Sequence, residues 1–191
     1  MNTVEQSTQA TVEIKQSKFI AHLVPIAAYD GLQEKLRAAH PKSRHVVYAL
    51  RMLNEHDQIV ENSSDDGEPK GSSAVPALNV LRGEEMINCA VLIVRYFGGT
   101  KLGIGGLVRA YTQATKAVIA EAEIKKYEKL HIFSYVSGYS EVQRIEYLLN
   151  QVGILDVKKE FASDVAWTVS ATQEKIDTFR ELVGRVITCD A

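Results

Sequence analysis

The sequence is short of cysteine, of long apolar runs and of net charge, and each shortage narrows what the protein can be. Its two cysteines, Cys89 and Cys189, are far apart and form no Cys-x-x-Cys spacing, which argues against a disulfide scaffold or a zinc knuckle and fits a reducing cytosol. The longest apolar run, residues 89–94, is far too short to span a bilayer, and the polar N-terminus lacks a signal-peptide pattern. We therefore expect a cytoplasmic protein without a membrane partner.

The formal net charge of −2 over 191 residues identifies no partner, but the charges are unevenly distributed. Residues 35–54 and 86–120 contain Lys and Arg but neither Asp nor Glu, and an acidic stretch, residues 55–68, separates them. If the two basic segments share a face of the fold, that face attracts anions. The alternative is an ordinary solvated surface of mixed charge.

Apolar periodicity predicts alternating strands and helices in the first part of the chain. Strands are predicted within 11–26 (two around a turn at 16–17) and at 45–53, 58–61 and 88–97. Helices are predicted at 28–40, at 75–81 and after the glycines that follow residue 97. Residues 62–73 are predicted to form a polar loop.

The composition changes near residues 125–128, and a second unit follows. Its predicted elements are a strand at 129–137, a helix that Ser140 and Gln143 begin as a capping box and Gly153 ends, strands at 154–161 and 165–170, and a last helix that begins at Thr172. The order β-α-β-β-α predicts a ferredoxin-like unit. We therefore expect two domains, residues 1–128 and 129–191.

Five glycines fall within nine positions between the apolar strand and the next helix, at Gly98, Gly99, Gly103, Gly105 and Gly106. Free N–H groups and the helix dipole make a helix N-terminus a site for anions, and glycine lets the backbone approach a ligand closely. We therefore predict a phosphate- or nucleic-acid-binding site here. Its candidate cations are Arg44, Arg95, Lys101 and Arg109. The alternative is a tight connection whose glycines only permit the turn and close packing.

This loop does not match the known nucleotide-binding motifs. A Walker A loop needs Lys and then Ser or Thr at the positions that Ile104 and Gly105 occupy here, and a dinucleotide fingerprint needs glycine where Val108 stands. The five histidines show no metal-ligand spacing, and no set of nucleophile, acid and base emerges. We therefore expect no catalytic residue, no cofactor and no metal.

A second polar loop, SSDDGEPKG, carries the candidate residues Asp65, Asp66, Glu68 and Lys70. Its three carboxylates can hold a magnesium ion, whereas the alternative is a solvated turn built on Asp-Gly and Glu-Pro. The following string, residues 71–74, resembles the phosphate loop of kinases of the galactokinase–homoserine kinase type. This resemblance supports an alternative function: a small enzyme or binding protein for a phosphorylated metabolite or nucleotide, with a metal held opposite Lys101.

Four segments carry a more specific resemblance: KQSKFIAHLVPI (15–26), RHVVYAL (44–50), SSDDGEPKGSSAVP (63–76) and VRYFGGTKLGIGGLVRAY (94–111). In this order they resemble the YigZ/IMPACT family. The resemblance covers the whole first domain, and the second domain is similar to the companion domain of bacterial members.

The resemblance implies an α+β protein of two α/β two-layer domains. The first is expected to be ribosomal-protein-like, as in domain IV of elongation factor G, and the second ferredoxin-like, as in domain V of that factor. Eukaryotic relatives regulate translation by competing for a scaffold that activates a kinase of a translation initiation factor, a circuit that bacteria lack. The implied function is therefore a non-enzymatic regulatory protein linked to translation, which binds RNA, the ribosome or a translation-associated protein.

Overall fold

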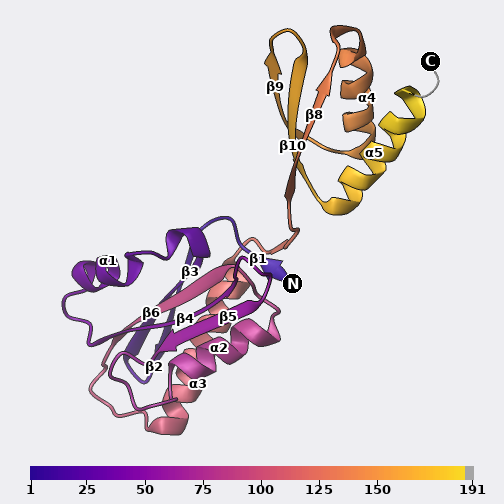
Figure 1. Cartoon of the computed structure of the whole chain (residues 1–191). Helices are drawn as coiled ribbons and strands as arrows, with labels where there is room; N and C mark the ends of the chain where they lie inside the picture. The colour runs from indigo at the N-terminus through magenta and orange to yellow at the C-terminus, as the bar shows by residue number, and fades with distance from the viewer. Residues whose placement is uncertain (188–191) are drawn as a thin grey trace. The chain divides into compact units, whose positions relative to one another are not determined.

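The computed structural model describes residues 1–187, with side chains described up to residue 184, so Cys189 and the end of the chain lie outside the described part. The chain divides into two compact units, Met1–Tyr127 and a second that begins at Glu128 (Figure 1). Both units combine helices with antiparallel sheet, as the expected α+β class requires. No helix within the described residues is long and apolar enough to cross a membrane.

The first unit is built on a five-stranded antiparallel sheet. Its strands, in spatial order, are β2 (Thr8–Ile14), β3 (Ser17–Pro25), β6 (Cys89–Tyr96), β4 (His45–Leu53) and β5 (Ile59–Ser64). The central strand, β6, is buried on both faces, which explains why its sequence is a continuous apolar run rather than an alternation. A short pair, β1 (Asn2–Thr3) with β7 (Lys125–Lys126), joins the two ends of this unit.

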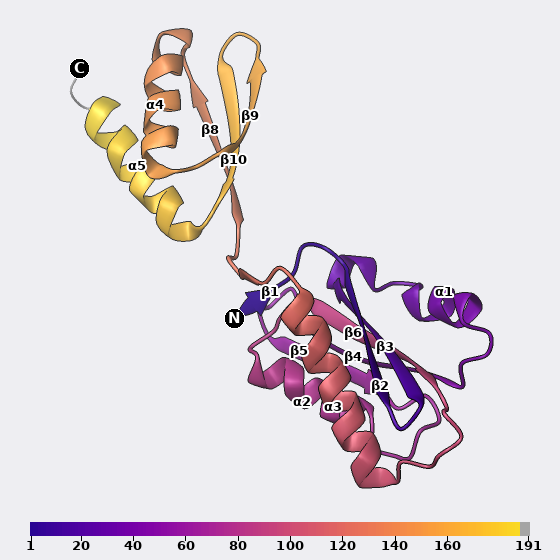
Figure 2. The same ribbon diagram turned by 180° about the vertical axis from the view of Figure 1, so that it is seen from behind.

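Helices cover both faces of this sheet. The larger core lies under α2 (Ala74–Gly83) and α3 (Ile104–Glu121), which cover one face of the sheet (Figure 2). Leu107 and Tyr111 of α3 belong to this core with Phe19 and Ile93 of the sheet. A smaller core on the opposite face includes Leu36 of α1 (Leu32–Ala39). The predicted helix at 28–40 begins late because residues 26–28 form a 3-10 turn and Gly31 adopts a left-handed φ of 67° just before α1. The predicted polar loop at 62–73 is shorter than expected, since β5 extends to Ser64.

The second unit has the predicted β-α-β-β-α order. It contains β8 (His131–Ser137), a 3-10 turn (Tyr139–Glu141), α4 (Val142–Val152), β9 (Asp156–Phe161), β10 (Val165–Ala171) and α5 (Gln173–Ile187). The sheet order is β8-β10-β9, with both pairs antiparallel. Val165, Trp167 and Val169 share the buried face of β10, as predicted, and the Trp167 indole donates a hydrogen bond to Ser137 Oγ at 2.9 Å.

The predicted start of the first helix in this unit is wrong, whereas its predicted end is confirmed. Instead of a box of Ser140 and Gln143, the Glu141 carboxylate accepts the Gly138 N–H at 2.9 Å, and the 3-10 turn leads into α4 two residues later than expected. Glu141 stands three residues after Gly138, the same spacing that separates Ser140 and Gln143, so the contact forms two residues earlier than predicted. Gly153 ends α4 with a left-handed φ of 74°.

The loop that follows β6 packs tightly against the turn between β2 and β3. A Cβ added at Gly98 would lie 2.0 Å from the carbonyl carbon of Gln16, whereas one added at Gly83, the last residue of α2, would meet no atom within 4 Å. We therefore expect Gly98→Ala to lower the free energy of unfolding by at least about 3 kcal/mol, the upper end of the usual cost of overpacking.

The matched control, Gly83→Ala, is expected to be neutral or to stabilise the protein by up to about 1 kcal/mol, because alanine favours a helix over glycine. Urea unfolding followed by far-UV circular dichroism measures both variants. Fluorescence of Trp167, the one tryptophan in the sequence, follows the second unit separately. Equal stability of the two alanine variants would contradict the close approach at Gly98.

Candidate anion-binding pocket

Asp65 fixes the loop between β5 and α2. Its carboxylate accepts hydrogen bonds from the N–H groups of Gly71 at 2.7 Å, Ser73 at 3.2 Å and Ala74 at 2.8 Å, and from the Ser73 hydroxyl. Partial burial opposes ionisation, but these hydrogen bonds outweigh it and hold the pKa of Asp65 below its usual value. The N-terminus of α2 is therefore already occupied by an anion from the protein itself.

Asp66 ties the same loop to β4 and α1. One carboxylate oxygen accepts the Val46 N–H at 2.6 Å, and the other accepts a hydrogen bond from Arg37 at 2.8 Å. The carbonyl of Asp66 lies 2.7 Å from Nδ1 of His45. Because a carbonyl oxygen can only accept, that ring nitrogen donates the bond.

Glu68 belongs to a buried network at the end of β6. Its carboxylate accepts hydrogen bonds from Arg95 Nη1 at 2.5 Å and from the Tyr111 hydroxyl at 2.8 Å, and the side chains of Glu68 and Arg95 are only 3% and 8% exposed. Burial and the neighbouring carboxylate raise the pKa of Tyr111 far above its ordinary value, so its hydroxyl remains a donor. The network joins the loop, β6 and α3.

The three carboxylates of this loop thus form neither a metal site nor a merely solvated turn. Asp65, Asp66 and Glu68 each bind different donors of the protein itself. Within the part of the chain that the structure describes, no group of three or more His, Cys, Asp or Glu residues is placed to hold a metal ion.

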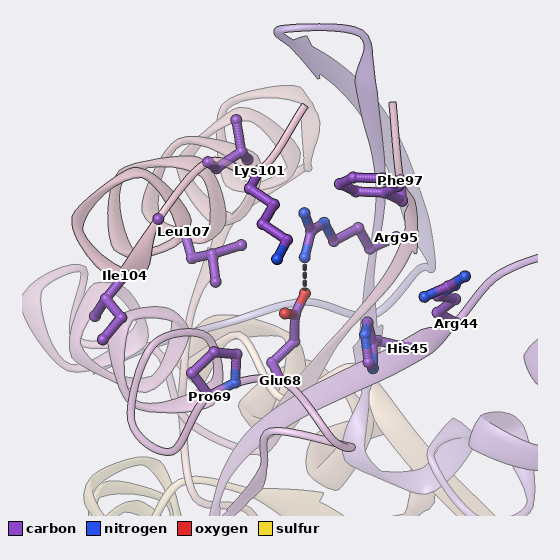
Figure 3. A pocket seen from close by; sticks show the side chains of 11 residues that line it. Arg44, His45, Glu68, Pro69, Arg95, Phe97, Lys101, Ile104 and Leu107 are labelled. Atoms are coloured by element: carbon purple, nitrogen blue, oxygen red, sulfur yellow. Dashed lines mark hydrogen bonds and ion pairs between the residues drawn. The ribbon is translucent and has the colours of Figure 1, made fainter. Parts of the chain in front are cut away.

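A cavity of about 360 Å³ opens between this loop, the end of β6 and the first turn of α3 (Figure 3). It lies within the range of about 300–1,000 Å³ that is typical of ligand pockets. Three cations and one carboxylate line it, together with apolar side chains. The lining residues are Arg44, His45, Glu68, Pro69, Arg95, Phe97, Lys101, Leu102, Gly103, Ile104 and Leu107.

Lys101 and Arg44 are the cations of this pocket that the protein has not neutralised. Both are exposed, and neither side chain forms an ion pair with any residue that the structure describes. Figure 3 shows the Lys101 ammonium turned into the pocket towards Arg95, whereas Arg44 lies beside His45. Their charges are therefore available to an external anion.

The N-terminus of α3 is open, in contrast to that of α2. No described side chain caps α3, and the Gly103 carbonyl accepts the Leu107 N–H at 2.9 Å as the first bond of the helix. The N–H groups that precede Leu107 in the first turn have no acceptor within the helix. Gly103 itself, with a φ of 70°, lines the pocket.

Most of the five glycines have structural reasons that do not involve a ligand. Gly98 packs on the backbone of Gln16, a Cβ at Gly106 would lie 3.0 Å from that of Leu102, and Gly99 and Gly103 have positive φ angles. Gly105 meets only ordinary contact, at 3.9 Å from Arg109. The glycines therefore shape the connection, and the predicted cations and helix amides remain the candidates for binding.

The structure gathers part of the predicted site around one cavity. Arg44, Glu68, Arg95, Lys101 and Gly103 line it, from segments that are far apart in the sequence. The register explains this meeting, because β4 and β6 are antiparallel and His45 pairs with Arg95.

Other predicted residues lie outside the cavity lining. Arg109 is exposed on α3 beside Gly105, and Lys70 is exposed on the loop. Sequence reasoning missed the apolar wall, above all Phe97, which is 44% exposed. The sequence signal that could have identified Phe97 is its position, because it is an aromatic residue between a buried strand and a Gly-Gly pair.

The fold and the pocket define a two-unit α+β protein with a cationic, partly apolar cavity in its first unit. Comparison with known proteins gives the family. Residues 15–119 match the family model described as the Impact N-terminal domain, more than half of the chain, and the chain therefore belongs to the IMPACT family.

Curated relatives cover most of the chain. It is 31% identical over 170 residues to the IMPACT family member YigZ of Escherichia coli, covering 87% of this chain and 83% of that protein. It is 28% identical over 182 residues to the IMPACT family member YvyE of Bacillus subtilis, covering 94% and 83%. A family member of Thermus thermophilus is 36% identical over 143 residues, covering 71% and 73%.

Two solved structures are similar as well. The crystal structure of a hypothetical protein superposes with a TM-score of 0.66 and 27% identity, covering 97% of this chain and 91% of that one. The two-domain translational regulator Yih1 superposes with a TM-score of only 0.43 and 23% identity over 62% of this chain and 48% of that one, which carries no argument about function.

The hydrogen bonds of Asp65 predict a pH-dependent contribution to stability. A carboxyl group whose pKa is lower in the folded state stabilises the fold above its unfolded value, here 3.8, and loses that effect as the pH falls further. We expect Asp65→Asn to lower the free energy of unfolding at pH 7 by about 1–3 kcal/mol, because an amide cannot accept all these bonds. When the pH falls below about 4, the variant should lose less stability than the native protein, because it lacks this one carboxyl group of lowered pKa.

Urea unfolding at neutral and acidic pH measures both effects. The control is Asp30→Asn, which changes an exposed carboxylate and should leave stability within about 0.5 kcal/mol of the native value. Asp65→Asn and Asp30→Asn with the same stability and the same pH dependence would refute the structural role of Asp65.

Proposed function

We propose that this protein is a non-enzymatic regulatory protein linked to translation, and that its first unit binds RNA phosphates in the pocket beside α3. The observation that carries this proposal is the meeting of two unpaired cations, Lys101 and Arg44, with an uncapped helix N-terminus at one cavity. Cations and free helix N–H groups together favour a phosphate oxygen.

The two helix N-termini of the first unit support this interpretation. Asp65 shows that the N-terminus of α2 binds a negative group, in this case a carboxylate of the same chain. At α3 the chain supplies no such group, and Lys101 stands beside the open end. Glu68 does not fill this role, because Arg95 and Tyr111 already bind its carboxylate.

The translation link comes from the family. Membership of the IMPACT family is shown, and the family resemblance likens the two units to domains IV and V of elongation factor G, which works on the ribosome. RNA is the most abundant phosphate polymer in that setting, and phosphate contacts with Lys and Arg supply most non-specific affinity for it.

A phosphorylated metabolite is the second candidate ligand, because the cavity volume suits a small molecule. The structure favours binding over metal-dependent catalysis here, since Asp65, Asp66 and Glu68 hold donors of the protein rather than converging on one point.

Salt dependence tests the proposal. Each phosphate contact releases counterions, so Lys101→Ala and Arg44→Ala should each weaken RNA binding and reduce the slope of log K against log salt by about one contact. The matched control is Lys116→Ala, which removes an exposed cation of α3 that does not line the pocket and should leave affinity and slope unchanged.

Ribosome co-sedimentation at low and high salt, together with filter binding of RNA, provides the measurement. Salt-independent binding, or equal losses in all three variants, would contradict phosphate recognition in this pocket. Stabilisation of the protein against heat by a phosphorylated metabolite, without RNA binding, would favour the second candidate.

A further inference from the structure

Part of the pocket lining is apolar, and phosphate binding does not account for it. Phe97 and Ile104 are 44% and 66% exposed, although both are large apolar side chains next to cations. Figure 3 shows Leu107 and Pro69 near Ile104 on one side of the pocket, and Phe97 on the other side beside Arg95. A pocket for inorganic phosphate alone would need no such surface, because apolar side chains neither donate hydrogen bonds to a phosphate nor neutralise its charge.

Arg95 packs against Phe97, the aromatic residue of the lining. Its guanidinium lies 5.9 Å from the centroid of the Phe97 ring and 5.6 Å from that of the Phe19 ring. The hydrogen bond from Arg95 Nη1 to the Glu68 carboxylate holds the guanidinium there. The Arg95 side chain is 8% exposed, and its Nε has no hydrogen-bond acceptor among the described residues. An unsatisfied buried donor is costly, so an acceptor that reached this nitrogen would be favourable.

The ligand that matches both parts of the lining is an anion joined to a flat, partly apolar group. A nucleotide has this composition, because its base has a π-face that stacks on aromatic side chains and its phosphate accepts from cations and N–H groups. The cavity, about 360 Å³, has the size of a site for a single small ligand unit.

Base pairing decides which form of RNA can use the whole pocket. In an A-form duplex the bases are stacked and paired inside the helix, so a duplex can present phosphates to Lys101 but no free base face to Phe97. Building on the proposed RNA binding, we infer that the pocket receives one unpaired nucleotide of single-stranded RNA, with its base against Phe97 and its phosphate at Lys101 and the first turn of α3.

Fluorescence anisotropy with the full chain tests this inference, using a labelled oligouridine and an RNA duplex of equal length. The native protein should bind the single strand more tightly than the duplex. Phe97→Ala should weaken single-strand binding by at least about fivefold, the low end of what one base–aromatic stack contributes, and leave duplex binding unchanged. Phe97→Tyr, which keeps the ring, should restore the affinity.

Phe161→Ala is the matched control, because it removes a phenylalanine that is 61% exposed in the second unit. Circular dichroism checks that each variant is folded, and Phe97→Leu, which keeps apolar bulk without a ring, gives a second test if the alanine variant unfolds. Phe97→Leu should lose single-strand affinity as Phe97→Ala does.

The outcomes separate this inference from the proposed function. Equal affinity for single strand and duplex, with no effect of Phe97→Ala, would overturn the unpaired-nucleotide site and leave phosphate binding standing. Absence of binding to either RNA would refute the proposed function itself. Uridine monophosphate that binds as tightly as the oligomer, with the same dependence on Phe97, would overturn the assignment to RNA in favour of a free nucleotide.

Discussion

The ion pair between Arg95 and Glu68 is the contact on which the pocket depends. Both side chains are more than nine-tenths buried, and the Tyr111 hydroxyl completes the set. Removing one member of a buried ion pair leaves the other charge uncompensated, which typically costs about 3–5 kcal/mol. Through this one carboxylate, the loop before α2, the end of β6 and the first turns of α3 are held together. The pocket is the space that these three segments leave between them.

The two helices that cover the same face of the sheet differ in how their N-termini are satisfied. The α2 N-terminus is closed by Asp65, which also receives the loop N–H groups and so fixes the chain on which Glu68 stands. The α3 N-terminus follows a glycine-rich loop and has no described cap. The loop between β5 and α2 thus supplies the carboxylate that caps α2. Through Glu68 it also forms a fixed side of the pocket next to α3, whose N-terminus it leaves open.

Much of the fold is readable from the sequence, because local patterns determine it. The strand at 45–53, the buried central strand and the β-α-β-β-α order of the second unit all follow from periodicity and turn residues. The predicted helix start near Ser140 is wrong because the Glu141 carboxylate binds the N–H of Gly138, two residues earlier, where a 3-10 turn precedes α4. The site is only partly readable, since strand register brings Arg44 to Arg95, and exposure at Phe97 depends on packing that no local pattern encodes.

The acid-free segments suggested a broad basic face, but the structure pairs part of their charge with carboxylates of the same chain. Arg37 pairs with Asp66, Arg51 with Glu61 and Arg95 with Glu68, so the acidic stretch between the basic segments neutralises three of their nine Lys and Arg residues. Of the three cations that line the pocket, Arg95 is paired, so among the described residues Lys101 and Arg44 remain there for phosphate contacts, and electrostatic attraction alone supplies limited affinity. A protein with so few free charges at its site needs further contacts to select a ligand, and the exposed apolar wall beside Lys101 is where this chain offers them.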